Sequence, residues 1–250
     1  VASLVGSEMC IRDSLQAKAT YFGLMTEIDE QLGRIFDYLK ATNQYDSTLI
    51  VFTSDHGEQL GDHYLFGKLG YFDASYHIPL IIRDPKRQLQ KVKTLEHFSE
   101  SVDVMPTILD WLGLEIPDQC DGRSLLPFLE NEVPRNWREE VHSEFDFRWI
   151  GSYQPMIEER FGLLPDECSL VIIRDDDYKY VHMTALPPLF FDLKRDPGEF
   201  INRVQDPDYR ELVLNYSSKM LSWMMNHRDR VLANINVEFG ELIHWRGPRN

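Results

Sequence analysis

Two side chains able to bind a metal ion lie next to each other directly after the most apolar short stretch of the chain. Asp55 and His56 follow residues 48–53, which read as a buried strand. A carboxylate and a neutral imidazole form part of a coordination sphere for a divalent cation. Because neighbouring strand residues point to opposite faces, both side chains reach one point only if the chain turns there, and Gly57 permits such a turn. The pattern predicts half of a metal site. The other interpretation of such a pair, taken alone, is an aspartate that caps a turn beside a packed histidine.

The elements before this pair predict how it is positioned. From Leu15 to about Asn43, apolar residues recur every three or four positions, which is typical of one long amphipathic helix. A turn at 43–47 leads into the strand 48–53, whose apolar residues do not alternate with polar ones, as in parallel strands. A helix, a short turn and a buried strand in this order predict an α/β layer, in which ligands gather beyond the carboxyl ends of the strands.

The rest of the chain predicts a second kind of architecture. Four more elements follow: an apolar strand at 77–85, a helix from Ser101 to Gly113, a small antiparallel sheet over 169–193, and a last helix over about 206–232. The pattern of predicted elements changes near residue 140. We therefore expect an α/β core over 15–140 and a small α+β subdomain with a terminal arm over 141–250.

Three stretches of the chain together resemble one known family. They are "TSDHGEQLGDHYLFGKLGYFDASYHIPLIIRDP" (53–85), "SVDVMPTILDWLGLEIPDQCDGRSLLPFL" (101–129) and "LFFDLKRDPGEFINRV" (189–204). In this order they resemble the sulfatase family of the alkaline phosphatase superfamily, and look closest to phosphonate monoester hydrolases and arylsulfatase-like enzymes. The likeness runs from Tyr21 to about Val204. It implies an α/β fold: part of an alkaline-phosphatase-like α/β/α sandwich, followed by a C-terminal subdomain with a small antiparallel β-sheet and a helix.

The resemblance also implies roles for three residues. Asp55 and His56 match the family's second pair of metal ligands, with calcium or manganese as the ion. Lys68, twelve residues after His56, matches the lysine that contacts the oxygens of the transferred group. Such a lysine makes chemical sense, because attack on phosphorus or sulfur builds negative charge on oxygens that a cation and an ammonium stabilise. An ordinary solvated lysine is the other interpretation of Lys68.

Several neighbouring residues are weaker candidates. Glu58 reads either as an acceptor that holds the loop or an imidazole, or as a solvated carboxylate. His63 and His77 lie near the site in sequence, and His77, just before a strand, is expected to be packed and hydrogen-bonded. Asp73 and Asp84 read as turn carboxylates.

The family's nucleophile is not recognisable in this chain. That nucleophile is a formylglycine made from the first residue of a Cys-x-Pro-x-Arg motif, and none of Cys10, Cys120 and Cys168 begins such a motif. Residues 1–14 show no clear helical period, and "VGSEMCIRDS" (5–14) resembles translated sequencing adapter. We therefore expect a non-native leader over 1–14, and we expect the rest to be the C-terminal part of a longer enzyme that carries the formylglycine upstream.

Charge and composition restrict the partners. With 41 Asp and Glu against 26 Lys and Arg, the formal net charge is −15. This charge repels a phosphate backbone and argues against nucleic acid, whereas one metal ion and one lysine can reverse the field locally for a small anionic ester. No apolar run approaches the length of a membrane span. The few scattered cysteines favour a reducing, cytoplasmic compartment.

The resemblance implies a metal-dependent hydrolase of phosphonate monoesters and phosphodiesters, with sulfate esters as further candidate substrates. The nearest alternative is an arylsulfatase or choline-sulfatase-like enzyme of the same fold. A non-catalytic assembly module is the alternative from another class, and the terminal arm at 234–250 suggests a homo-oligomer in the full-length parent. Because a nucleophile is lacking, this chain alone is expected to show no turnover.

Overall fold

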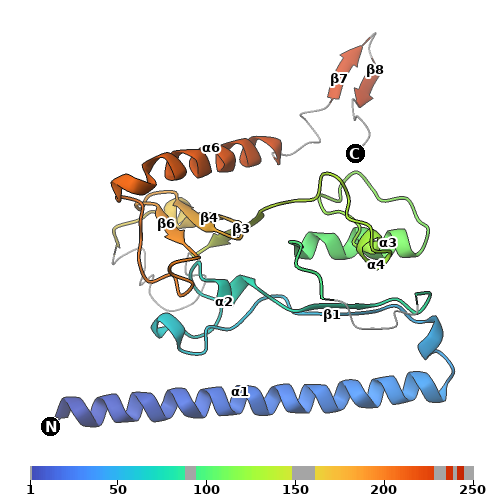
Figure 1. The fold of residues 1–250 in the computed structure, drawn as a ribbon, viewed down its shortest axis with the longest axis horizontal. Coiled ribbons are helices and arrows are strands. Elements are labelled where there is room, and N and C mark those ends of the chain that lie inside the picture. Colours follow the sequence, from blue (N-terminus) through green and yellow to red (C-terminus); the bar gives the residue numbers. More distant parts are fainter. Residues whose placement is uncertain (1, 88–93, 148–160, 228–234, 239–240, 245–250) are drawn as a thin grey trace. The chain divides into compact units, whose positions relative to one another are not determined.

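The protein folds as two compact units, residues 1–95 and 96–250. A computed structural model describes residues 2–87, 94–147, 161–227, 235–238 and 241–244 of the chain (Figure 1). The first unit contains, in chain order, α1 (Ala2–Ala41), η1 (Tyr45–Ser47), β1 (Ile50–Thr53), η2 (Asp62–Tyr64), α2 (Asp73–Tyr76) and β2 (Leu80–Arg83).

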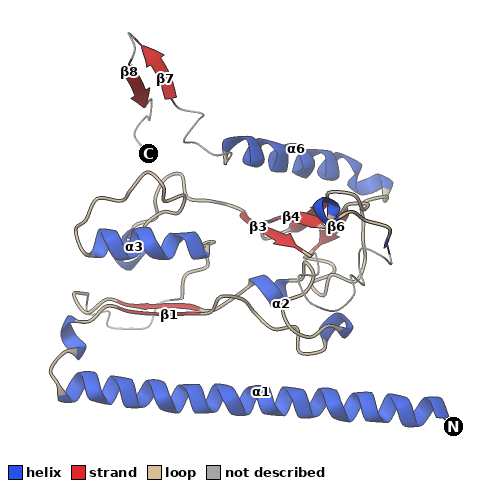
Figure 2. Ribbon diagram, turned by 180° about the vertical axis from the view of Figure 1, so that it is seen from behind, coloured by secondary structure: helices blue, strands red, loops and turns tan. Residues whose placement is uncertain are grey.

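The long helix predicted from Leu15 onward is present as α1, but it begins at Ala2 (Figure 2). Residues 2–14 contain no proline, and each residue added to an existing helix gains a hydrogen bond without a new nucleation step. Helix α1 therefore extends through residues 2–14 although the sequence shows no apolar period there. Asn43 ends α1 with a φ of 57°, and Gln44 N–H donates to the Leu39 carbonyl at 2.8 Å in a left-handed C-terminal cap.

The strand before the candidate site is antiparallel to its neighbour, so the parallel arrangement predicted from its composition is wrong. β1 pairs with β2, with Ile50 opposite Arg83 and Thr53 opposite Leu80. A short continuous apolar run indicates partial burial on both faces and carries no information on strand direction. The direction follows from the connection over 54–79, which returns the chain without a crossover helix that spans the sheet.

The second unit contains the predicted small antiparallel sheet and the last helix. Its described elements are η3 (Ser101–Asp103), α3 (Val104–Trp111), α4 (Leu126–Leu129), β3 (Val141–Asp146), η4 (Pro165–Glu167), β4 (Ser169–Arg174), β5 (Tyr178–Met183), β6 (Leu189–Asp192), η5 (Pro207–Tyr209), α6 (Arg210–Asn226), β7 (Ile235–Glu238) and β8 (Glu241–His244). Strands β3 to β6 form one sheet in sequence order, every pair antiparallel, and β7 pairs with β8. The sequence predicted β4, β5 and β6 and did not reveal β3.

The core of this unit lies between the sheet and α6. Ile173, Tyr180 and Phe190 occupy one row across three strands, because each is the register partner of the next. All three are almost fully buried against Tyr216 and Met220 of α6. The ring of Phe190 meets that of Tyr216 edge to face, with centroids 5.5 Å apart, an arrangement that aromatic pairs favour. The helical spacing seen in the sequence therefore marks the core-facing side of α6.

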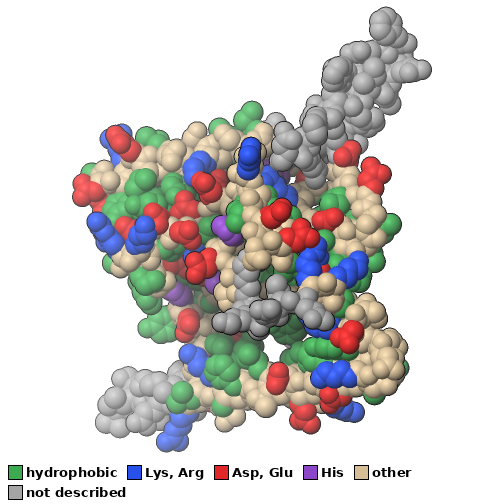
Figure 3. Space-filling view, turned by 45° about the vertical axis from the view of Figure 1, so that its right-hand side comes forward, with side chains coloured by type: hydrophobic (Ala, Val, Ile, Leu, Met, Phe, Trp, Pro, Cys, Tyr) green, Lys and Arg blue, Asp and Glu red, His purple; other side chains and the backbone are tan. Residues whose placement is uncertain are grey.

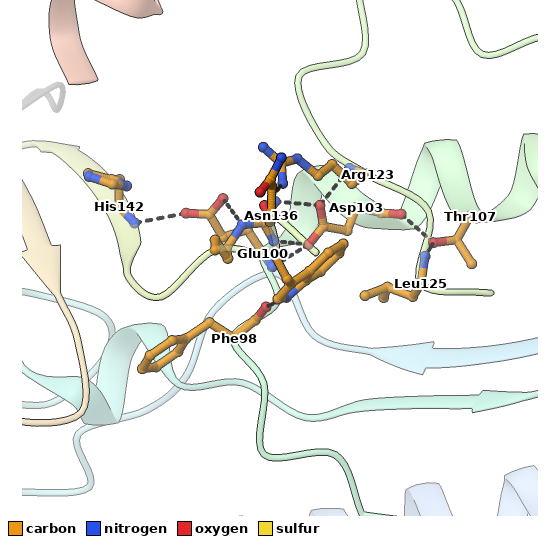
Figure 4. Close-up of polar contacts among 10 residues, drawn as sticks. Phe98, Glu100, Asp103, Thr107, Arg123, Leu125, Asn136 and His142 are labelled. Atoms are coloured by element: carbon orange, nitrogen blue, oxygen red, sulfur yellow. Dashed lines mark hydrogen bonds and ion pairs between the residues drawn. The ribbon is translucent and has the colours of Figure 1, made fainter. Parts of the chain in front are cut away.

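A buried charge network fixes the start of α3 (Figure 4). The side chain of Asp103 is fully buried and forms two contacts with the guanidinium of Arg138, one of them 2.8 Å from Nη2. Asp103 Oδ2 also accepts the backbone N–H of Glu100 and Oδ1 that of Arg123, each at 2.8 Å. A buried carboxylate is tolerated when its oxygens are satisfied in this way. The network ties the η3–α3 junction to segments 20 and 35 residues further along the chain.

No helix among the described residues is long and apolar enough to cross a membrane. On the face that Figure 3 presents, acidic side chains are interspersed with Lys and Arg, and no large purely basic patch is visible. Cys120 and Cys168 are both buried.

The first prediction concerns a buried ion pair. Lys179 Nζ lies 2.5 Å from Glu199 Oε1, and the two side chains are only 2% and 4% exposed. The substitution Glu199→Ala should lower the free energy of unfolding by about 3–5 kcal/mol, because it removes the carboxylate that pairs with the buried ammonium of Lys179. Urea unfolding of the chain measures this. The matched control is Glu132→Ala, an exposed glutamate, and a Glu199→Ala loss no larger than that of the control would contradict the prediction.

The second prediction concerns the pH dependence of stability. The His142 side chain is 8% exposed, its ring stacks on Trp223 with centroids 4.4 Å apart, and its Nε2 has no hydrogen-bond partner among the described residues. Burial, assisted by the positive charges of His227, Arg138 and Lys219, lowers the pKa of His142 to about 4.

Because the unfolded chain binds this proton near the ordinary pKa of about 6.5 and the folded chain does not, the free energy of unfolding should decrease as pH falls from about 6.5 to about 4. Replacement of His142 by Phe keeps the stacking and removes the titration, so urea unfolding of His142→Phe should show a shallower pH dependence over this range. Identical slopes for both proteins would show that His142 is not responsible.

Candidate metal and anion site

The turn after β1 closes against α2 at a position that only glycine can occupy. The N–H of Gly57 donates to the carbonyl of Ser75 at 2.9 Å. A Cβ on Gly57 would lie 2.0 Å from the Ala74 carbonyl oxygen, well inside van der Waals contact with backbone. The predicted turn at Gly57 therefore arises from a close approach between two backbone segments.

The turn places the side chains of Asp55 and His56 near each other. Asp55 Oδ1 accepts the backbone N–H of His56 at 3.0 Å, and Asp55 Oδ2 lies 3.7 Å from His56 Nε2. The other ring nitrogen, Nδ1, is 2.7 Å from the Gly57 carbonyl, to which it can only donate. In the neutral ring the proton is therefore on Nδ1, and the lone pair of Nε2 is available on the side of the Asp55 carboxylate.

The electrostatics favour an ionised Asp55. The N–H of His56 lowers the pKa of Asp55 below its ordinary value, and the charges of the His56 ring and of Lys68 act in the same direction. The Asp55 side chain is 85% exposed and that of His56 37%, so both remain accessible. Lys68 is also exposed, and its field reaches the carboxylate across the loop.

These two side chains suit a divalent cation. Two ligands bound at about 2.0 to 2.4 Å from one ion lie roughly 3 to 4 Å apart, which includes the 3.7 Å between Asp55 Oδ2 and His56 Nε2. Within the described parts of the chain, no group of three or more His, Cys, Asp or Glu side chains is arranged to hold an ion. The described residues thus offer two donors, fewer than calcium or manganese prefers. The roles of Asp55, His56 and Lys68 stay predictions.

The weaker candidates have other positions in the structure. Glu58 holds the loop, because its Oε1 accepts the N–H groups of Leu60 and Gly67. His63 stacks on Phe72 with ring centroids 3.6 Å apart.

The remaining candidates differ from one another in burial. Asp84 is a buried turn carboxylate whose Oδ1 accepts the N–H of Lys86 at 2.9 Å, and Asp73 lies in the first turn of α2. His77 is exposed, so the expectation of a packed histidine was wrong. It lies at the C-terminal end of α2, where its backbone N–H donates to the Asp73 carbonyl.

The sequence analysis missed Gln59. Its side chain is fully buried, and its Nε2 donates to Ser75 Oγ at 2.7 Å and to the Leu69 carbonyl at 3.3 Å. A polar residue in a loop gives no apolar pattern, so no local signal indicated this burial. It arises because the segments around Leu69 and Ser75 return to cover the residue.

Comparison with protein families gives two matches. The profile described as "Sulfatase" matches residues 5–114. The profile described as "N-sulphoglucosamine sulphohydrolase, C-terminal" matches residues 61–226, more than half of the chain. The second match includes Lys68 and the sheet formed by strands β3 to β6.

Individual relatives agree with these matches. The multifunctional alkaline phosphatase superfamily protein PehA of Trinickia caryophylli is 57% identical over 219 residues, which are 88% of this chain and 42% of that protein. An arylsulfatase of Clostridium perfringens is 31% identical over 208 residues, 82% of this chain and 39% of that protein. The chain therefore spans less than half the length of these relatives.

A solved structure supports the expected fold class. The crystal structure of the phosphonate monoester hydrolase of Agrobacterium radiobacter matches with a TM-score of 0.83 and 44% identity, over 91% of this chain and 45% of that one. This agreement confirms the α/β fold and the antiparallel C-terminal subdomain predicted from the sequence. On the evidence of sequence motifs, family profiles and fold, the chain belongs to the sulfatase family of the alkaline phosphatase superfamily.

Proposed function

We propose that the whole protein is a metal-dependent hydrolase of phosphonate monoesters and phosphodiesters, to which this chain contributes metal ligands and an anion-binding lysine. The observation that carries the proposal is the 3.7 Å approach of Asp55 Oδ2 to His56 Nε2, on the loop that also bears Lys68. The substrate class is supported by two relatives of high identity, one named as a multifunctional alkaline phosphatase superfamily protein and one as a phosphonate monoester hydrolase.

The residues of this chain have distinct roles in the proposed reaction. Asp55 supplies an ionised oxygen and His56 the lone pair of Nε2. A divalent cation, calcium or manganese, supplies Lewis-acid polarisation of the ester when bound. Lys68 supplies an ammonium that neutralises charge developing on the oxygens of the transferred group. In an acidic chain of net charge −15, this local positive field is required for a small anionic ester to approach.

The nucleophile and the assembly are further parts of this proposal. A formylglycine outside this chain is the proposed nucleophile, because no cysteine here begins a Cys-x-Pro-x-Arg motif. A homo-oligomer in the cytoplasm, without nucleic-acid or membrane partners, is the proposed state of the full-length protein.

Sulfate-ester hydrolysis is the second candidate activity. It is favoured by the match of the sulfatase profile and by the arylsulfatase relative. The competing tetrahedral esters carry the same single negative charge and differ in the central atom. Both need a cation and an ammonium, so the described residues suit both. Initial rates of the full-length enzyme with 4-nitrophenyl methylphosphonate and with 4-nitrophenyl sulfate, which share one leaving group, decide between them. A higher kcat/KM for the sulfate would reverse the order of the two candidates.

The third prediction concerns metal binding by this chain. Calorimetric titration with manganese should show weak binding, because two protein ligands leave most coordination positions to water. Asp55→Ala and His56→Ala should each abolish the measurable heat, whereas Asp46→Ala, an exposed aspartate of the same unit, should leave it unchanged. Sub-micromolar affinity, or binding that survives both site substitutions, would contradict the prediction.

The fourth prediction concerns Lys68. In the presence of manganese, Lys68→Ala should weaken the binding of inorganic phosphate roughly tenfold or more, because one charge-assisted hydrogen bond contributes about 1.5–3 kcal/mol. Phosphate titration followed by NMR measures the dissociation constant. Lys40→Ala, at an exposed lysine of α1, is the matched control. A non-catalytic assembly module predicts instead that Asp55→Ala and Lys68→Ala leave phosphate binding and the function of the full-length protein unaltered.

A further inference from the structure

The backbone on both sides of Lys68 is hydrogen-bonded to one pair of neighbouring residues, Glu58 and Gln59. On the N-terminal side, Glu58 Oε1 accepts the N–H of Gly67 at 2.6 Å, and the N–H of Gln59 donates to the carbonyl of Gly67 at 3.1 Å. On the C-terminal side, Gln59 Nε2 donates to the carbonyl of Leu69 at 3.3 Å. The residue before Lys68 and the residue after it are thus both fixed.

The same pair is fastened to the turn that carries the candidate metal ligands. Gln59 Nε2 also donates to Ser75 Oγ at 2.7 Å, and the carbonyl of Ser75 accepts the N–H of Gly57 at 2.9 Å. Ser75 is 3% exposed and Gln59 is fully buried, so these hydrogen bonds are shielded from water. The hydrogen-bonded path from the turn at Gly57 to the backbone beside Lys68 therefore runs through Ser75, Gln59 and Leu69.

The loop that Glu58 and Gln59 close would not hold its shape unaided. Leu60, His63 and Tyr64 have φ values of 51°, 51° and 60°, a region that residues other than glycine seldom adopt. Each such conformation costs roughly 1–3 kcal/mol and persists only where the surroundings impose it. Strain of this kind is concentrated at functional sites, and here it lies between the metal-ligand turn and Lys68.

We propose that Glu58 and Gln59 are positioning residues that orient Lys68 toward an anion at the metal ion that Asp55 and His56 would hold. The proposal rests on the function proposed above and adds two residues to it. Glu58 acts as a hydrogen-bond acceptor for Gly67 and not through its charge. Gln59 acts through its amide N–H groups. Neither residue touches the substrate.

Three variants separate this role from its alternatives. Glu58→Gln keeps a carbonyl oxygen for the N–H of Gly67 and removes the charge. Glu58→Ala removes the acceptor. Gln59→Met keeps the length and volume of the buried side chain and removes both of its donated hydrogen bonds. Gln31→Met, at an exposed glutamine of α1, is the matched control for the last change.

Two measurements on the 250-residue chain compare these variants with the unsubstituted chain. One is the dissociation constant for inorganic phosphate in the presence of manganese, and the other is hydrogen exchange at the backbone N–H of Gly67. Glu58→Ala and Gln59→Met should weaken phosphate binding roughly 10- to 100-fold, as loss of outer-shell partners does elsewhere, and should accelerate exchange at Gly67. Glu58→Gln and Gln31→Met should resemble the unsubstituted chain in both measurements.

The outcomes distinguish failure of this inference from failure of the proposed function. If Lys68→Ala itself leaves phosphate binding unchanged, the proposed function is overturned. If Lys68→Ala weakens binding but Glu58→Ala and Gln59→Met do not, the positioning role is overturned. A loss in Glu58→Gln as large as in Glu58→Ala overturns the acceptor role, because the charge is then what matters. Thermal unfolding shows whether each variant folds. If Glu58→Ala does not fold, Gln59→Met tests the positioning role by itself.

Discussion

The contact between the backbone of Gly57 and the carbonyl of Ala74 is the constraint on which the candidate site depends. With no side chain at Gly57, the turn after β1 approaches α2 closely enough for its N–H to reach the Ser75 carbonyl. That closure determines where the chain is directed after Thr53, and hence that Asp55 and His56 lie on the same side. A strand that continued straight would place these two side chains on opposite faces.

Environment gives two neighbouring carboxylates different properties. Asp55 is largely exposed and receives one backbone N–H, which leaves Oδ2 available near His56. Glu58, three residues later, is engaged by the N–H groups of Leu60 and Gly67. The same functional group is therefore a candidate metal ligand at one position and a structural acceptor at the other. The hydrogen bonds that each carboxylate accepts decide between the roles, not its place in the motif.

The second unit shows how buried charge is used for architecture alone. Asp103 is buried with Arg138. Its carboxylate accepts the backbone N–H groups of Glu100 and Arg123 (Figure 4). Lys179 and Glu199 join β5 to the turn after β6. Because these pairs are shielded from water, their loss should lower the stability of the unit.

The amino-acid sequence determined the elements and their order, because helical and strand periodicity depend on local spacing. The helices α1, α3 and α6 and the strands β4 to β6 follow from it, as do the candidate metal-ligand pair and the membership of a family. Tertiary structure alone decided the antiparallel direction of β1, the presence of β3, and the burial of Gln59. Each of these depends on which segment returns to lie beside another. A local pattern records how apolar a face is, but the partner of that face is fixed only when residues distant in the sequence, such as Ile50 and Arg83, come together.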